Sequence, residues 1–247
     1  MLSAVIITYN EERNIERCIN SLKPVVEEII VIDSYSSDNT RNICESLNVK
    51  FHQIKWRGYS ETKNYGHELA EHPYILSIDA DESLSDELQN SIVKLRKKGM
   101  EACYSFNRLS NYCGNWVKHC GWYPDVKVRI FPKQVKWKGE IHEELQLKGM
   151  EIIHLKGDLY HYTYYNHKEH KDRADKYSVL TAQKMFEKGK KAGWLKPELS
   201  AFFKFISIYF FKLGFADGKA GWHIARISAA SNKVKYKTLR HLIRENK

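Results

Sequence analysis

The sequence lacks the patterns that mark several common functional classes. Its 247 residues contain no G-x-G-x-x-G fingerprint and no P-loop consensus, which argues against a dehydrogenase and a P-loop enzyme. No nucleic-acid-binding module pattern is present, so we expect no nucleic-acid partner. Five cysteines at irregular spacings fit neither a disulfide framework nor a familiar zinc pattern. These absences favour an enzyme or binding protein of another class with free thiols.

A long, uncharged hydrophobic run is also missing. The best candidate, residues 199–216, is 18 residues long and contains Lys204 and Lys212, so its length lies at the lower limit for a spanning helix. The two lysines favour a helix that lies in the membrane interface, with a buried core helix as the alternative. The N-terminal residues do not read as a signal peptide, so we expect a cytoplasmic protein.

Charge is distributed unevenly along the chain. Acids outnumber lysine and arginine in the first hundred residues, whereas the remainder is strongly basic and gives the chain its net charge of +10. The basic tail holds Lys233, Lys235, Lys237, Arg240 and Arg244. Basic residues that follow a phenylalanine-rich segment favour an anionic membrane surface as partner.

The first hundred residues alternate between strand and helix patterns. Apolar runs at residues 4–8, 29–32 and 74–78 read as strands, as does the stretch at residues 49–54, and amphipathic stretches separate them. This order predicts an α/β fold with a mostly parallel sheet flanked by helices. We expect a catalytic domain at residues 1–165, with halves 1–100 and 101–165, followed by a helical, basic region at residues 166–247.

Acidic side chains crowd together after the fourth predicted strand. Asp79 and Asp81 point to the same side of an extended chain, and Glu82 follows directly. Such crowding is explained by a divalent cation that bridges to a phosphate-bearing ligand, or by a helix start nearby. Polar clusters at residues 8–12 and 33–38 also follow strands, and the carboxyl ends of parallel strands form ligand sites. The convergence favours a metal and nucleotide site.

Three of these segments together resemble a known family. The sequences AVIITYNEE (residues 4–12), IVIDSYSSDNT (30–40) and IDADE (78–82) resemble family 2 glycosyltransferases of the GT-A fold. The later segments KVRIF (127–131), WKGEIHE (137–143) and His161 with the following tyrosine resemble bacterial lipopolysaccharide core β-1,4-glucosyltransferases. The resemblance implies inverting transfer of a hexose, glucose foremost, from a nucleotide sugar to a lipid-linked or core saccharide of the cell envelope.

The resemblance also implies how a UDP-hexose would be held. Thr8, Asn10 and Glu12 would line the nucleotide pocket, and Asp33 would hydrogen-bond the base, although Ser34 stands where relatives often have a second aspartate. Lys63 matches a basic position near the diphosphate, with a solvated helix face as the alternative.

The metal and the reacting groups follow from the same resemblance. Asp79 would face the ribose or the ligand shell, Asp81 would bind Mg²⁺ or Mn²⁺, and His161 would complete the metal shell unless it is only structural. The predicted general base is Glu143, and Arg129 would hold an anionic acceptor or the diphosphate. The other candidates for the base are Glu144 and Asp125.

Alternatives to this function remain open in the sequence. Transfer to a polyprenyl phosphate would use the same first hundred residues but would need no base, and a nucleotidyltransferase also uses two acids and a metal. A non-catalytic nucleotide-binding protein would keep the fold. For the enzyme we expect a peripheral position on the inner face of a bacterial inner membrane, and the sequence leaves its oligomeric state open.

Overall fold

The computed structural model describes residues 1–139 and 143–246, and the chain divides into two compact units. Unit 1 comprises residues 1–108 and 125–162, and unit 2 comprises residues 109–124 and 163–247. Residues 109–124 therefore belong with the C-terminal helices, whereas the sequence analysis placed them in the catalytic domain.

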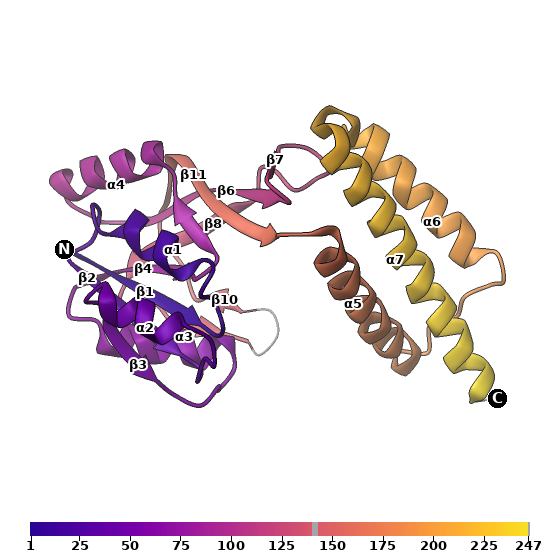
Figure 1. Cartoon of the computed structure of the whole chain (residues 1–247), viewed down its shortest axis with the longest axis horizontal. Coiled ribbons are helices and arrows are strands. Elements are labelled where there is room, and N and C mark those ends of the chain that lie inside the picture. Colours follow the sequence, from indigo (N-terminus) through magenta and orange to yellow (C-terminus); the bar gives the residue numbers. More distant parts are fainter. Residues whose placement is uncertain (140–142, 247) are drawn as a thin grey trace. The chain divides into compact units, whose positions relative to one another are not determined.

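The first part of unit 1 is a four-stranded parallel sheet (Figure 1). Its strands stand in the order β3-β2-β1-β4, and every neighbouring pair is parallel. The strands are β1 (Leu2–Thr8), β2 (Glu28–Asp33), β3 (Lys50–Gln53) and β4 (Tyr74–Asp79), and the helices between them are α1 (Ile15–Leu22), α2 (Thr40–Ser46) and α3 (Tyr59–Leu69).

The sheet continues beyond β4 with antiparallel pairing. In the described residues it runs on through β8, β6, β11 and β5, with β7 paired to β6, and β8 is antiparallel to both β4 and β6. The sheet is thus mixed. The remaining elements here are β5 (Glu82–Leu84), α4 (Asp86–Lys98), β6 (Cys103–Tyr112), β7 (Asn115–Val117), β8 (Val126–Pro132), β11 (Ile152–Tyr164) and a separate hairpin of β9 (Trp137–Lys138) and β10 (Glu144–Leu145).

Hydrophobic cores cover both faces of the sheet. Alternate residues of β1 point to opposite faces: Ala4 and Ile6 join a core that includes the buried stripe of α1, whereas Val5 and Ile7 join a second core on the other face. Helix α3 approaches that second face so closely that a Cβ on Gly66 would lie 2.4 Å from a methyl carbon of Val5. Helices on both faces confirm the predicted α/β class.

Two helix starts compare differently with the sequence. Ser85 caps α4, because its hydroxyl accepts a hydrogen bond from the Leu88 amide. Asn10 caps no helix, although asparagine is a favoured cap residue: α1 begins at Ile15, and Asn10 adopts a left-handed conformation with φ 54°. Asparagine tolerates that conformation because its short polar side chain bonds locally, and this frees Asn10 for the loop described below.

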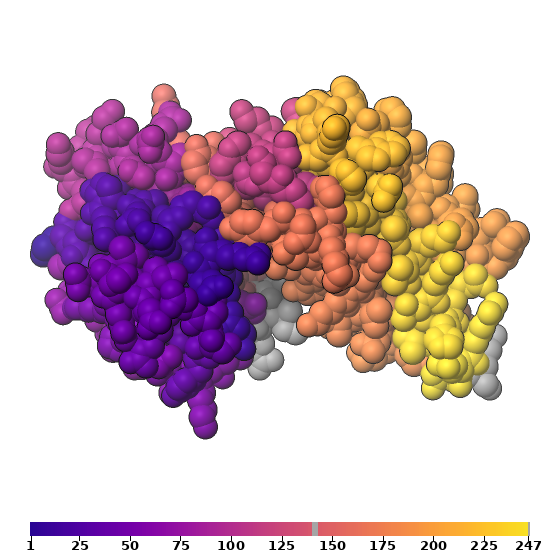
Figure 2. Space-filling model, in the orientation of Figure 1, coloured from indigo at the N-terminus to yellow at the C-terminus, as the bar shows by residue number. Residues whose placement is uncertain are grey.

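Unit 2 is built around a long central helix. Helix α7 (Gly218–Glu245) packs against α5 (His167–Glu187) and against α6 (Lys196–Ile206). In Figure 2 the side chains of α6 and α7, coloured from orange to yellow, lie against one another over the visible face. A π-helical turn η1 (Ser207–Phe211) and a 3-10 turn η2 (Gly214–Asp217) join α6 to α7.

This unit has a small core of its own, which includes Tyr112, Ile208 and Ile224. Within the described residues no single helix has the length and apolar character needed to cross a membrane. The segments Lys196–Phe211 and Gly214–Glu245, bent by 71°, satisfy that test of length and composition only as a pair.

Candidate functional site

Three predicted site residues stand at the ends of adjacent strands. Thr8 ends β1, Asp33 ends β2 and Asp79 ends β4. In the register of the sheet Thr8 lies opposite Asp33, and Ile7 lies opposite Asp79. Because these strands are parallel, their carboxyl ends meet at one edge of the sheet, where ligands bind in such folds.

The loops that follow β1 and β2 are tied to each other. The Asn10 amide donates to Ser36 Oγ at 2.8 Å, and Asn10 Oδ1 accepts from the Ser37 amide at 2.8 Å. One turn further on, Glu12 Oε2 accepts from the Asn39 amide at 2.9 Å. The predicted nucleotide-pocket residues Asn10 and Glu12 therefore hold the two loops in one rigid arrangement.

Asp33 lies buried beneath these loops with acceptor capacity to spare. Its carboxylate accepts from the amide and hydroxyl of Ser36 and from Gln53 Nε2 at 3.0 Å. Beside it, the buried hydroxyl oxygens of Thr8 and Ser34 have no hydrogen-bond partner among the described residues. Because buried polar atoms are normally paired, these orphaned hydroxyls point to a polar ligand at this edge.

Asp79 sits between two cations. Lys63 Nζ, from α3, lies 3.2 Å from Asp79 Oδ1, and an Arg129 terminal nitrogen, from β8, lies 2.9 Å from Oδ2. Desolvation would raise the pKa of Asp79, but the charges of Lys63 and Arg129 outweigh it and hold the pKa well below the usual range. Asp79 therefore stays ionised, with both oxygens engaged by the protein.

Glu82 holds both Arg129 and the backbone of Asp79 in place. Its buried carboxylate accepts from Arg129 at 2.8 and 2.9 Å and from the Asp79 amide at 3.0 Å. Burial by itself would lower the pKa of Arg129. The negative charges of Glu82 and then Asp79 outweigh burial, so the pKa of Arg129 is raised above its usual value. Sequence reasoning left Glu82 as a mere neighbour. Its position directly after Asp79 and Asp81 was the signal in the sequence that could have indicated a role for Glu82. Its partner Arg129 lies 47 residues further along the chain, so the pairing itself could not be read from the sequence.

Asp81 points to a different partner from Asp79. Asp81 Oδ2 lies 3.3 Å from His161 Nε2, on β11, and the Asp81 carbonyl accepts from the Tyr162 amide at 2.9 Å. Antiparallel pairing of β11 with β5 sets His161 opposite Glu82 in register. The structure thus brings together the two predicted metal ligands, which are separated by 80 positions in the chain.

The predicted base is close to the same lysine. Glu143 Oε1 lies 3.1 Å from Lys63 Nζ, and the lysine also stacks over the Trp137 ring, 4.7 Å from its centroid. Lys63 is buried, so its alternative as a solvated helix residue is wrong. Residues 140–142 of the motif around Glu143 lie outside the described residues.

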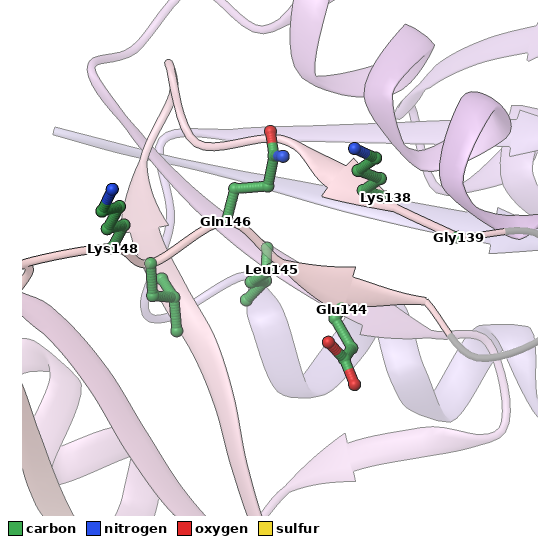
Figure 3. A pocket seen from close by; sticks show the side chains of 7 residues that line it. Lys138, Gly139, Glu144, Leu145, Gln146 and Lys148 are labelled. Atoms are coloured by element: carbon green, nitrogen blue, oxygen red, sulfur yellow. The ribbon is translucent and has the colours of Figure 1, made fainter.

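The two other candidates for the base lie in different surroundings. Asp125 is bound by Arg108 at 2.7 Å and by Lys127 at 2.9 Å. Glu144 begins β10 and lines a hollow of about 610 Å³ beside Lys138, Leu145 and Lys148 (Figure 3). Because the acid pair and the strand ends do not line this hollow, we place the candidate site at the strand ends instead.

The residues present suit a divalent cation only in part. No group of three or more His, Cys, Asp or Glu able to hold a metal ion occurs among residues 1–139 and 143–246. Asp81 and His161 offer one carboxylate oxygen and one imidazole nitrogen. Mg²⁺ and Mn²⁺ accept such a small protein set when substrate phosphates and water supply the remaining ligands.

Comparisons with known proteins show sequence similarity to glycosyltransferases. The chain is 30% identical to the lipopolysaccharide core biosynthesis glycosyltransferase LpsC of Rhizobium meliloti, over 85% of this chain and 80% of LpsC. It is 28% identical to an uncharacterized glycosyltransferase of Rickettsia typhi, over 98% of this chain and 87% of that protein.

Solved structures and a family model complete the comparison. Residues 1–349 of S. aureus TarS, solved in complex with UDP-GlcNAc, align with a TM-score of 0.52 at 16% identity, covering 100% of this chain and 92% of that one. This likeness shows the fold alone, and it confirms the expected GT-A architecture. The family model described as glycosyl transferase family 2 matches residues 3–146. The resemblance read from the three motifs is confirmed, and the chain belongs to glycosyl transferase family 2.

Proposed function

We propose that this chain transfers a hexose, with inversion, from a UDP-sugar to a hydroxyl of a lipopolysaccharide core or another envelope glycan. Glucose is the hexose that we propose first. The observation that carries the proposal is the edge formed by β1, β2 and β4, where Asp79, Asp81 and the orphaned hydroxyls of Thr8 and Ser34 gather in a family 2 glycosyltransferase. The name of the relative LpsC supports an envelope glycan as acceptor.

The nucleotide would occupy the β1–β2 side of this edge. An ionised carboxylate offers about four acceptor sites, and three protein donors bond to Asp33. The remaining capacity suits the imide N–H of uracil, and the Thr8 and Ser34 hydroxyls would satisfy the ribose or base edge. Asn10 and Glu12 support this pocket through the loop bonds that they make.

The diphosphate would lie over the Lys63–Asp79 side. Lys63 is the cation that we assign to the diphosphate, because its ammonium group lies between Asp79 and Glu143. Both carboxylate oxygens of Asp79 are already bonded to Lys63 and Arg129, so Asp79 could bond the ribose only by sharing them. We therefore assign Asp79 chiefly the role of positioning Lys63. Arg129, first expected to bind the acceptor or diphosphate, is buried against Asp79 and Glu82, and we assign it to positioning Asp79.

Asp81 and His161 would hold Mg²⁺ or Mn²⁺ together with the phosphate oxygens. The bound ion would act as a Lewis acid that neutralises the negative charge on the departing diphosphate. The aspartate and the imidazole are already 3.3 Å apart, so little rearrangement of the protein is needed to present both groups to one cation.

Glu143 would act as the general base. The acceptor hydroxyl gives its proton to the Glu143 carboxylate while its oxygen bonds to the anomeric carbon. The bond between that carbon and the phosphate oxygen breaks on the opposite face, which inverts the anomeric centre and releases UDP. Lys63, 3.1 Å from Glu143, orients the carboxylate and links the base to the diphosphate side of the site.

The proposed setting is the inner face of a bacterial inner membrane, where a lipid-linked acceptor would be reached. Unit 2 supports this setting, because it contains 20 lysines and arginines against 7 acids, a net charge of +13. Anionic lipid headgroups attract such a surface.

A donor screen tests the activity. The purified chain is incubated with single nucleotide sugars, Mg²⁺ or Mn²⁺ and an envelope saccharide extract, and nucleoside diphosphate release is measured. We expect release with UDP-glucose or another UDP-hexose, dependence on the extract, and loss on chelation of the metal. The matched variants are Asp81→Asn, which should be inactive, and Lys136→Met at an exposed pair with Glu68, which should be unaffected.

Three outcomes would contradict this function. Absence of release with every donor while the chain binds UDP in calorimetry would indicate a non-catalytic nucleotide-binding protein. Transfer to a polyprenyl phosphate but not to saccharides, with full activity in Glu143→Gln, would favour the phosphate-acceptor alternative. Release of pyrophosphate from a nucleoside triphosphate would favour a nucleotidyltransferase.

A further inference from the structure

Unit 2 leaves a large set of apolar side chains uncovered on and after α6. Phe202, Phe203 and Phe211 are 60%, 63% and 83% exposed. Soluble proteins rarely leave contiguous apolar surface of this kind without a binding partner. We define the aromatic face as the exposed residues Leu195, Leu199, Phe202, Phe203, Phe210, Phe211, Leu213 and Phe215.

The aromatic face follows from the helical spacing. Leu195, Leu199, Phe202 and Phe203 recur at intervals of four, three and one, so they share one side of α6. The opposite side supplies Phe205, which packs on the unit 2 core, and Ile208 in η1 belongs to that core. Pro197 is the single buried residue within α6. One side of the segment therefore packs on the core, as the alternative of a core helix expects, whereas the aromatic face lies outside that core.

The turn that carries the second half of this face is held rigidly. Asp217 accepts hydrogen bonds from the Lys118 amide at 3.1 Å, the His119 amide at 2.9 Å and His119 Nδ1 at 2.9 Å. The Lys212 carbonyl accepts from the Cys120 amide at 2.9 Å. These bonds fix residues 212–217, so Leu213 and Phe215 are presented by an ordered turn, and binding would cost little additional ordering.

The segment that carries this face contains charges of one sign. Residues 199–216 contain Lys204 and Lys212 and no acid, and the two acids that flank the segment are already engaged: Glu198 pairs with Lys233 at 2.6 Å, and Asp217 holds the turn. The whole unit has a net charge of +13. A second copy of this unit would repel it, whereas anionic headgroups would attract it.

We propose that the aromatic face inserts in the plane of an anionic phospholipid surface, with the phenylalanines at the boundary of headgroups and acyl chains. This identifies the element behind the membrane partner proposed above, but it does not depend on glycosyl transfer. The 71° bend between the α6 and α7 segments suits a helix hairpin that lies in the interface, since its phenylalanines can contact the acyl chains while the surplus of basic residues in the unit attracts the headgroups.

Vesicle sedimentation of the full chain tests the proposal. Vesicles of phosphatidylcholine with 30% phosphatidylglycerol are compared with pure phosphatidylcholine at low and high salt. We expect binding to the anionic vesicles at low salt, and a loss of at least about tenfold in the partition coefficient for the triple variant Phe202→Ser, Phe203→Ser, Phe211→Ser, because three apolar insertions are removed.

A matched control is available within the same unit. Tyr177 on α5 is 63% exposed, as is Phe203, but lies outside the aromatic face. Tyr177→Ser should change the partition less than twofold, while Phe203→Ser alone should reduce it about threefold or more. Circular dichroism and UDP binding establish that each variant is folded, and UDP release assays report on the proposed function separately.

Three results would overturn the proposal. The first is sedimentation of the triple variant equal to that of the unchanged chain, which would show that binding is purely electrostatic. The second is no sedimentation of the unchanged chain with anionic vesicles at low salt. The third is a dimer of the unchanged chain in light scattering that the triple variant disperses without any vesicle binding, which would assign the face to self-association.

Discussion

The two units use charge in opposite ways. In unit 1 the charges of the site lie at the end of a buried sheet and form close ion pairs. Lys63 and Arg129 pair with Asp79, and Arg129 also pairs with Glu82. In unit 2 basic residues outnumber acids 20 to 7, and most aromatic side chains of its α6 segment face solvent. Internal pairing rigidifies a site for small ligands, whereas a surplus of one sign recruits an extended partner. The comparison predicts that equivalent substitutions will have very different effects in the two units.

The largest effect is expected from removing the buried cation of unit 1. Arg129→Met leaves Asp79 and Glu82 facing each other without their shared partner, and breaking a buried pair in this way costs about 3–5 kcal/mol of folding free energy. Urea unfolding followed by circular dichroism measures the loss. The triple variant Arg129→Met, Asp79→Asn, Glu82→Gln should recover a large part of it. A single variant as stable as the unchanged chain would show that the network is dispensable.

Substitutions of Asp79 and Asp81 should have different effects on stability and activity. Asp81→Asn should reduce nucleoside diphosphate release by about 100-fold or more with little change in the unfolding midpoint, because Asp81 faces His161 at the ligand side. Asp79→Asn should reduce both, because it weakens the bonds to Lys63 and Arg129. Melting curves and release assays on the two variants make the test. Equal melting temperatures would contradict the structural role assigned to Asp79.

Acid sensitivity should come from a buried histidine of unit 1. Burial first, then the charge of Lys136, lowers the pKa of His67 to about 3, against about 6.5 in the unfolded chain. The unfolded state therefore binds the proton more readily, so stability is full above pH 6.5 and falls on acidification towards pH 3, by up to about 1.4 kcal/mol per pH unit. Urea midpoints at pH 5 and pH 7 measure this slope.

A buried histidine in the other unit contributes to the same acid slope. His67→Phe should flatten the dependence, since it removes the titrating ring from its buried position. His170, whose pKa is lowered to about 4 chiefly by burial, is hydrogen-bonded to the Tyr112 hydroxyl at 3.0 Å, so His170→Phe should also lose that bond. If His67→Phe retained the slope of the unchanged chain, another group would be responsible.

The smallest effect is expected from an ion pair at the surface of unit 2. Lys233 pairs with Glu198 at 2.6 Å, with both side chains partly exposed. Such pairs contribute about 0.2–1 kcal/mol because solvent screens them, so Lys233→Met should shift the urea midpoint only slightly. A loss as large as that of Arg129→Met would remove the contrast between the two units.

Much of unit 1 could be predicted from local sequence. Apolar runs gave β1, β2 and β4 within a few residues, because strands buried on both faces have a recognisable composition; β3, which is only half-buried, was still located within a residue. Residue type alone is misleading at Asn10, where the side chain bonds Ser37 across two loops rather than capping a helix. Local patterns also could not predict that residues 109–124 join unit 2, because that grouping depends on contacts such as the one between His119 and Asp217.

The candidate site was also predicted only in part from the sequence. The motifs indicated Thr8, Asp33, Asp79 and Asp81, since each lies at the end of a predicted strand or just after it. Glu82 and Arg108 were missed as partners in the network, because their significance depends on pairing across distant strands.

By itself, the sequence determined the α/β class, the family and the acid pair, because these reside in short patterns whose spacing is set by strand and helix geometry. The tertiary structure alone decided which charge meets which: it set Asp79 between Lys63 and Arg129, and Asp81 beside His161. It also decided that the phenylalanines after α6 stay outside the core. Coulomb energy and burial depend on distances through space, and those distances exist only once the chain has folded.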